Sequence, residues 1–324
     1  MHHVFARFRL TVGLTGFLLA AAVGSAAGPQ AVQWPDAGEQ EVLQKIADLF
    51  LARGEVVKND DGTLKSVSFK GRPKKDNASF SLRFDPKTQR VVQVVGNGAG
   101  ITNEEYQLVA QLSDLTNLTL FHNSPGGDRS EWPTIADGAG LVAFKNNASL
   151  GTICLAGGPL DNDGLEAIAQ LPQVDYLRIW HIAADDDGFK ALRNHPGLAK
   201  IRVAPTWQPT ITDATIEHLS TCPNLASLTY GEGYLTWENG LRHLTKLKGT
   251  LKTVDLLNTL IAPEDLDRFR QAMPDVEVKH EGFAEVGAAL AGDDRRSKNA
   301  LKNLQQWAPQ ELIDRAIAAS KDAK

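Results

Sequence analysis

Short apolar triplets recur along most of this chain at a nearly constant interval. In the segment QLPQVDYLRIW, the apolar residues Val174, Leu177 and Ile179 stand at positions i, i+3 and i+5. The same triplet begins at residues 115, 150, 198, 225 and 251, with a degenerate copy at 91 and a truncated one at 276. Six of the seven intervals are 24 to 27 residues long. A period of this length indicates a solenoid of stacked, equivalent units.

Each period also carries a short amphipathic stretch before the next triplet. The stretches include GLEAIAQLP, GFKALRNHP, TIEHLSTCP and DLDRFRQAMP. Their apolar residues are spaced three or four apart, which is the spacing of one buried helical face. Polar residues that precede such stretches predict helix N-caps. These predicted caps are Asp163, Asp187, Asp213 and Thr236.

Each period therefore predicts a short strand, a turn, a short helix and a second turn. A single unit of this kind cannot bury its apolar edge, whereas stacked units pair their strands in parallel and share one core. The predicted fold class is α/β: a right-handed solenoid with a curved parallel sheet on its concave side and short helices on its convex side.

The LxxLxL triplets and their period resemble those of leucine-rich-repeat proteins. The stretches TITDATIEHLSTCPNLASLTY and NTLIAPEDLDRFRQAMPDVEV are similar to exported bacterial families with short T-x-V-T-D-A-G-L turns. Thr206 and Thr259 match the threonine of that turn, and Asn123 alone matches the asparagine that follows the strand in other subclasses. The resemblance covers residues 91–281. It implies the fold and says little about the ligand, because such repeats bind many partners.

The first 27 residues have the pattern of a secretory signal peptide. Arg7 and Arg9 precede the uncharged run from Leu10 to Val23, and the small residues 25–27 follow it. The run is shorter than the ~20 apolar residues of a spanning helix. We therefore expect cleavage near Ala27 and an exported, periplasmic or secreted protein with no membrane span after cleavage. The alternative is an uncleaved anchor.

The segments on either side of the repeats predict caps. Residues 28–90 form an N-terminal linker and cap, with a helix over 38–53 and strands at TLKSVSF and ASFSLRF; the alternative is a separate small domain. Residues 282–324 form a C-terminal tail or cap, with two helices broken by Pro309. This tail either packs on the last repeat or serves as a mobile segment that binds a partner.

Charge and cysteine content narrow the class of protein. The net charge is −5, and removal of the signal peptide makes it about −7, so we expect no nucleic-acid partner. The cysteines, Cys154 and Cys222, lie three repeats apart at different places in the period. Strands are spaced about 5 Å apart, so the separation exceeds the ~7 Å limit of a disulfide. We expect two unpaired thiols.

Alternation along a strand places positions i+2, i+4 and i+6 of each triplet on the open face of the sheet. Large aromatic and basic side chains occupy these positions on two adjacent strands. Aromatic residues and arginine are enriched at interface hot spots, which favours a binding surface. The alternative is that these side chains cover one another and pair with a nearby acid. The candidate residues of this face are Phe121, Tyr176, Arg178, Trp180, Lys200, Arg202 and Asp255.

The longest interval between triplets contains the insertion SPGGDRSEWP, residues 124–133. Insertions in a solenoid emerge at one edge and often carry specificity. Trp132 is the large apolar residue of this loop, and we expect it to contact a ligand, to anchor the loop on the body, or both.

Metal and catalytic patterns are weak in this sequence. The acidic clusters Asp161/Asp163 and Asp185/Asp186/Asp187 lack EF-hand spacing and stand where helix N-caps belong, which favours capping over calcium binding. The sequence contains no HExxH motif, zinc spacing or GxSxG elbow. We therefore predict no metal, no cofactor and no catalytic residue.

These observations predict a non-catalytic, monomeric binding or protein-interaction scaffold of the bacterial envelope or exterior. The expected partner is a protein or an anionic glycan. One alternative is an enzyme, or an enzyme-associated subunit, that acts on polysaccharide or peptide. A second alternative is a structural spacer in an envelope complex.

Overall fold

The computed structural model describes residues 34–35, 37–73, 75–124 and 136–322. Residues 34–324 form one compact unit. The predicted signal peptide lies outside the described residues. None of the described helices is both long enough and apolar enough to cross a membrane.

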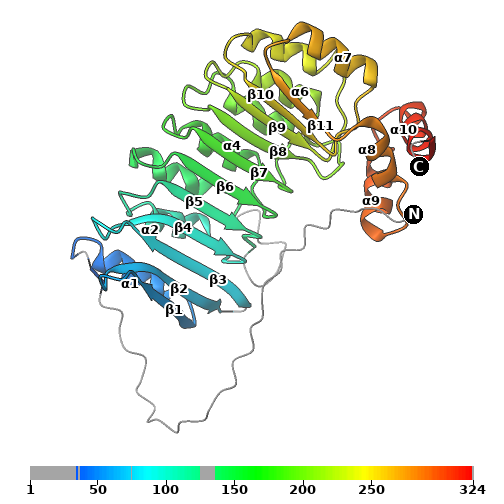
Figure 1. Ribbon diagram of the computed structural model, residues 1–324. Helices are drawn as coiled ribbons and strands as arrows, with labels where there is room; N and C mark the ends of the chain where they lie inside the picture. Colours follow the sequence, from blue (N-terminus) through cyan, green and yellow to red (C-terminus); the bar gives the residue numbers. More distant parts are fainter. Residues whose placement is uncertain (1–33, 36, 74, 125–135, 323–324) are drawn as a thin grey trace. The chain divides into compact units, whose positions relative to one another are not determined.

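The described strands form one eleven-stranded sheet in chain order (Figure 1). The first four strands are antiparallel, and every later strand pairs in parallel with its predecessor. The antiparallel strands are β1 (Ala52–Lys58), β2 (Leu64–Arg72), β3 (Lys75–Phe84) and β4 (Val91–Asn97). The later strands are β5 (Asn117–Phe121), β6 (Thr152–Ala156), β7 (Tyr176–Trp180), β8 (Lys200–Ala204), β9 (Ser227–Gly231), β10 (Thr253–Leu257) and β11 (Glu277–His280).

The parallel strands pair in the register that the triplets predict. Leu118, Ile153 and Leu177, the middle residues of three successive triplets, stand side by side on β5, β6 and β7. All residues of the six full triplets are buried, so the predicted inward face is confirmed. Each buried aliphatic side chain contributes roughly 1.5–3 kcal/mol to folding, and repetition makes this face a continuous core.

Short helices and 3-10 turns connect the parallel strands, and Figure 1 shows the connecting helices along one side of the sheet. Their apolar residues pack on the buried face. An α/β solenoid is therefore confirmed. The connecting elements are α2 (Asn103–Val109), η2 (Ala139–Asn146), α4 (Asn162–Ala169), α5 (Asp186–Phe189), η3 (Lys190–Leu192), α6 (Asp213–Leu219), η4 (Leu241–Leu247) and α7 (Pro263–Ala272).

Three helix N-caps lie one or two residues earlier than predicted. Asp161, Asp185 and Thr212 accept backbone N–H bonds at the starts of α4, α5 and α6. The predicted caps Asp163, Asp187 and Asp213 instead lie inside these helices. Thr236 is also not a helix cap, because η4 begins after Gly240. The first turn of each helix contains polar residues, which do not contribute to the apolar spacing. The helix start predicted from that spacing therefore lies too late in the sequence.

The N-terminal segment contains a strand that the sequence did not predict. The helix expected over 38–53 is shorter, since α1 covers Gln40–Asp48, and Ala52–Lys58 forms β1. β1 is mostly polar and exposed, and it pairs antiparallel with β2. Its strand conformation is therefore set by the neighbouring strand rather than by its own apolar pattern.

The C-terminal segment forms three helices where two were predicted: α8 (Phe283–Leu290), α9 (Arg295–Leu304) and α10 (Gln310–Asp322). Their apolar residues share a core with Trp207 and Leu260, which follow β8 and β10. The Trp307 indole N–H donates to the Trp207 carbonyl over 3.1 Å, and Arg315 pairs with Glu264 of α7 at 2.6 Å. The tail therefore contacts the turns after several strands.

Candidate functional site

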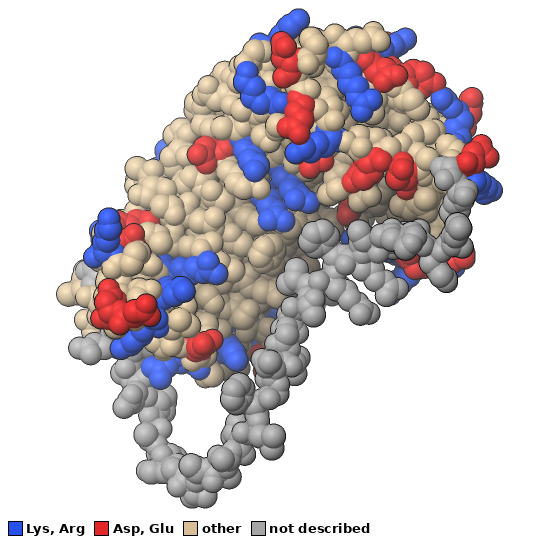
Figure 2. All heavy atoms as spheres, in the orientation of Figure 1, with Lys and Arg blue, Asp and Glu red and all other residues tan. Residues whose placement is uncertain are grey.

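The open face of β7 and β8 carries the predicted cluster of aromatic and basic side chains. Tyr176 stands directly beside Lys200, and Arg178 beside Arg202, in the strand register. Trp180 is the last residue of β7. Figure 2 shows Lys and Arg side chains gathered over the middle of the sheet. The five residues predicted on these two strands therefore lie together, in the arrangement that strand alternation implied.

Trp180 lies at the centre of this cluster. The guanidinium carbon of Arg178 is 3.9 Å from a Trp180 ring centroid, and that of Arg202 is 5.6 Å away. The Phe121 ring is 6.2 Å from Trp180, and the Lys200 ammonium is 4.6 Å from the Tyr176 ring. Cation–π contacts of this kind orient the guanidinium groups while leaving N–H donors for a ligand.

The cations of this cluster form no salt bridge with a described acidic side chain, although Arg202 lies near enough to Glu232 for the two charges to interact. In the described part of the chain, Arg178, Arg202 and Lys200 have no ion-pair partner, and the buried Nε of Arg178 has no hydrogen-bond acceptor. Asp255 lies on β10 beside Thr229, and the pairing of the cluster with Asp255 is not seen. Like charges on facing strand positions are destabilising, so an anionic ligand would stabilise this arrangement.

On the neighbouring strands β5 and β6, side chains of the open face are less exposed than their register predicts. Thr119, Cys154 and Ala156 occupy open-face positions but are buried. In the strand register, Arg178 stands beside Cys154 and Trp180 beside Ala156. Burial raises the pKa of the Cys154 thiol, and the nearby Arg178 opposes that effect. Cys154 and Cys222 are both unpaired, as predicted.

Trp132 and most of the inserted loop lie outside the described residues.

A sharp backbone turn follows most of the parallel strands. His181 and Glu232 each have a φ of +56°, and Asn258 has +49°, while Gly98 and Gly157 occupy the equivalent place after β4 and β6. The His181 and Glu232 N–H groups donate to the last carbonyl of the next strand over 3.2 and 2.9 Å. This repeated turn brings the side chains that follow the strands to one edge of the sheet.

His181 and Glu232 meet at this edge, together with an arginine from α9. The imidazole Nε2 of His181 is 3.0 Å from a Glu232 carboxylate oxygen, and Arg296 lies 3.7 Å from the other oxygen. The hydrogen bond to His181 holds the pKa of Glu232 below its usual value, and Arg296 and Arg202 add to this effect. Glu232 is therefore a partly buried anion held by His181 and Arg296, with Arg202 acting on its charge from a greater distance.

Two adjoining hollows surround this trio. The smaller hollow, about 160 Å³, reaches from Trp180 and Arg202 to Arg296. The larger one, about 420 Å³, lies between the turn after β8 and α9. Both are lined by His181, Glu232 and Arg296, so they form one groove. We call it the strand-end groove; it continues the open-face cluster toward the C-terminal helices.

Among the groove residues that sequence reasoning missed are Glu232 and Arg296, which form its ion pair. Glu232 stands seven residues after the first residue of its triplet, the same position as His181 in its own repeat. The period could therefore have identified Glu232. Arg296 carries no such signal, because α9 lies outside the repeats and reaches the groove only through tertiary packing.

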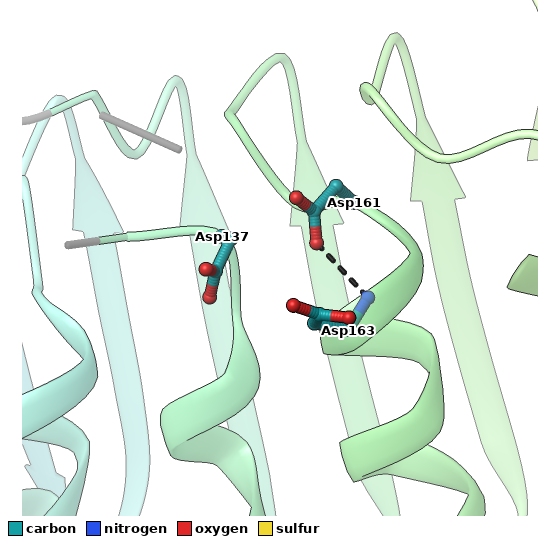
Figure 3. A group of neighbouring side chains, drawn as sticks. All are labelled: Asp137, Asp161 and Asp163. Atoms are coloured by element: carbon teal, nitrogen blue, oxygen red, sulfur yellow. Dashed lines mark hydrogen bonds between the residues drawn. The ribbon is translucent and has the colours of Figure 1, made fainter. Parts of the chain in front are cut away.

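Three carboxylates gather near the starts of η2 and α4 (Figure 3). Ligand oxygens of Asp137, Asp161 and Asp163 lie within 4.8 Å of one another. Asp161 accepts the Asp163 N–H over 3.0 Å, and Asp137 accepts from Ala139 N–H and Asn103 Nδ2, each over 2.8 Å. Burial and the charge of Asp137 raise the pKa of Asp161. Asp161 thus caps α4, and three carboxylates supply at most six oxygens, the lower end of the six to eight that calcium takes.

The strand order and the buried triplets define an α/β solenoid. No family model and no curated protein matches the chain. Among solved structures, the chain is similar to a leucine-rich-repeat protein of Leptospira interrogans, with 15% identity over 54% of this chain and a TM-score of 0.32. The match covers 51% of that protein, so the chain spans about half its length. The fold class rests on the topology, register and burial described above.

Proposed function

We propose that this chain is a non-catalytic binding scaffold of the bacterial envelope or exterior that holds a partner on the open face of β7 and β8. The observation that carries this proposal is the side-by-side pair Arg178 and Arg202, stacked on Trp180 without a carboxylate partner in the described part of the chain. In the protein without its partner, the positive charges of Arg178 and Arg202 repel each other. An acidic partner would reduce this repulsion.

The rigidity of the surrounding sheet supports this proposal. Leu177, Ile179 and Ile201 alternate with the cluster residues and are fully buried, so the cluster side chains project from a fixed backbone. A preorganised surface loses little conformational entropy on binding. The signal-peptide pattern of residues 1–27 supports the exported location.

Binding of the mature protein, residues 28–324, to glycan and acidic-peptide arrays tests the proposal. We expect one class of acidic ligand to bind, and we expect Trp180→Ala and Arg202→Ala to weaken binding by ~10-fold or more, as at interface hot spots. Lys145→Ala is the matched control, because Lys145 is an exposed cation in η2, away from the open face. Unchanged binding in both cluster variants would remove the open face as the site.

A further inference from the structure

We propose that the strand-end groove binds an acidic sugar unit, a hexuronate, within the partner that the open face holds. This inference rests on the proposed function and adds the chemical class of the ligand. The groove has a volume of about 420 Å³ beside α9 and about 160 Å³ beside Trp180, which is in the range of sites for small ligands.

The charges lining the groove favour a carboxylate. Arg202, Arg296 and Lys302 line it, and Glu232 is the one acidic residue among the described lining residues. Glu232 already forms a hydrogen bond with His181 and an ion pair with Arg296, so its negative charge is compensated within the protein. Arg202 and Lys302 have no ion-pair partner in the described ranges. An arginine fork binds a carboxylate through two parallel hydrogen bonds.

The neutral side chains of the groove favour a ligand with several hydroxyl groups. Gln208, Asn299 and Asn303 present amides, each with donors and an acceptor. Within the described chain, the amides of Gln208 and Asn299 make no side-chain hydrogen bond to protein, whereas Asn303 donates weakly to the Thr206 carbonyl over 3.5 Å. A simple anion needs only cations. Eight of the ten residues lining the larger hollow are polar or charged, which favours a ligand with many hydroxyl groups over an acidic peptide.

The backbone of the groove is strained in a way that suits a binding site. Four of the eight described non-glycine residues with positive φ line it: His181, Thr206, Trp207 and Glu232. Left-handed conformations are unfavourable for non-glycine residues, and such strain gathers at ligand sites. The equivalent turns after β4 and β6 use Gly98 and Gly157 instead. The turns after β5 and β10 carry His122 and Asn258 in the same conformation, so the side chains of His181 and Glu232, rather than the strain alone, distinguish the groove.

Calorimetric titration of the mature protein with uronate trisaccharides tests this inference. The probes are trimers of galacturonate, glucuronate and mannuronate, the methyl ester of whichever trimer binds, and hexaglutamate. We expect one trimer to bind and its methyl ester to bind at least about tenfold more weakly, because the ester keeps every hydroxyl group and loses the charge. Equal affinity for the ester would overturn carboxylate recognition. Tighter binding of hexaglutamate would overturn the sugar in favour of a peptide.

Variants on α9 separate the groove from general surface charge. Arg296→Ala should weaken trimer binding about tenfold, whereas Arg295→Ala, the adjacent exposed arginine outside the groove, should not change it. Asn299→Ala should weaken binding of the trimer and leave that of hexaglutamate unchanged. All three positions are exposed, so melting temperatures should match the wild type.

Two further results overturn the inference. One is that no trimer binds; the other is that Arg296→Ala and Asn299→Ala leave trimer affinity unchanged. The proposed function is judged separately, because binding that is lost in Trp180→Ala but kept in Arg296→Ala would retain the open-face scaffold and remove the groove.

Discussion

The two faces of the parallel sheet follow opposite rules, although they alternate along the same strands. On the buried face every full repeat carries similar apolar residues, such as Leu177 on β7 and Ile201 on β8. On the open face the residues change from strand to strand, from the small Cys154 on β6 to Arg178 on β7. The comparison teaches that the periodic face specifies the fold, whereas the irregular face specifies what the fold can bind.

The largest effect expected from this comparison is the difference between one buried and one open position. Leu177→Ala should lower the free energy of unfolding by about 2–5 kcal/mol, because it leaves a cavity in the continuous core. Lys200→Ala, next along the sheet but exposed, should change it by less than about 0.5 kcal/mol. Urea denaturation of the two variants measures both values. Similar losses would show that the two faces do not differ as described.

The side of the sheet covered by helices should also determine how stability depends on pH. Asp213 accepts hydrogen bonds from the Thr236 backbone N–H and hydroxyl, and burial raises its pKa from the ordinary 3.8 to about 6. The folded protein therefore holds this proton more tightly than the unfolded chain. Stability should fall by up to about 3 kcal/mol as pH rises from about 4 through 6.

The substitution Asp213→Asn isolates this contribution, because asparagine keeps the shape and cannot ionise. Urea denaturation of the wild type and the variant at pH 5 and pH 8 gives the comparison. We expect the wild type to lose more stability than the variant over that interval. The same slope in both proteins would mean that Asp213 is not the buried acid responsible.

A smaller effect is expected at the acidic group beside α4. Asp161→Ala should cost about 1 kcal/mol, the usual value of a lost N-cap, whereas Asp161→Asn should keep the cap and relieve the repulsion by Asp137. The melting temperature of the wild type should not change on addition of calcium. A calcium-dependent rise that disappears in Asp137→Asn would replace the capping interpretation with a metal site.

The smallest effect is a difference in reaction rate between one thiol on each side of the sheet. Cys154 is 4% exposed on the open face, and Cys222 is 0% exposed, with burial raising its thiol pKa to about 11. The thiolate is the reactive form, so both should react slowly in the folded protein, and Cys222 more slowly than Cys154. Alkylation rates of Cys222→Ser and Cys154→Ser, each with one thiol left, measure the two. The reverse order would contradict the assigned faces.

Much of the site could be predicted because a strand has a period of two. Once the triplets fixed the inward residues, alternation alone placed Tyr176, Arg178 and Trp180 on the open face beside Lys200 and Arg202. The same reasoning did not show that Cys154 would be covered, because coverage depends on the sizes of side chains on neighbouring strands. The exact cap positions were also missed, since polar residues at a helix start carry no apolar period.

The amino-acid sequence by itself determined the solenoid, its register and the residues of the open-face cluster, because a repeated local pattern must be satisfied in the same way in each unit. Only the tertiary structure decided that Ala52–Lys58 would become a strand and that α9 would bring Arg296 to Glu232. Both outcomes depend on contacts between segments that do not share the repeat period. The strand at Ala52–Lys58 and the position of Arg296 therefore follow only from the tertiary packing.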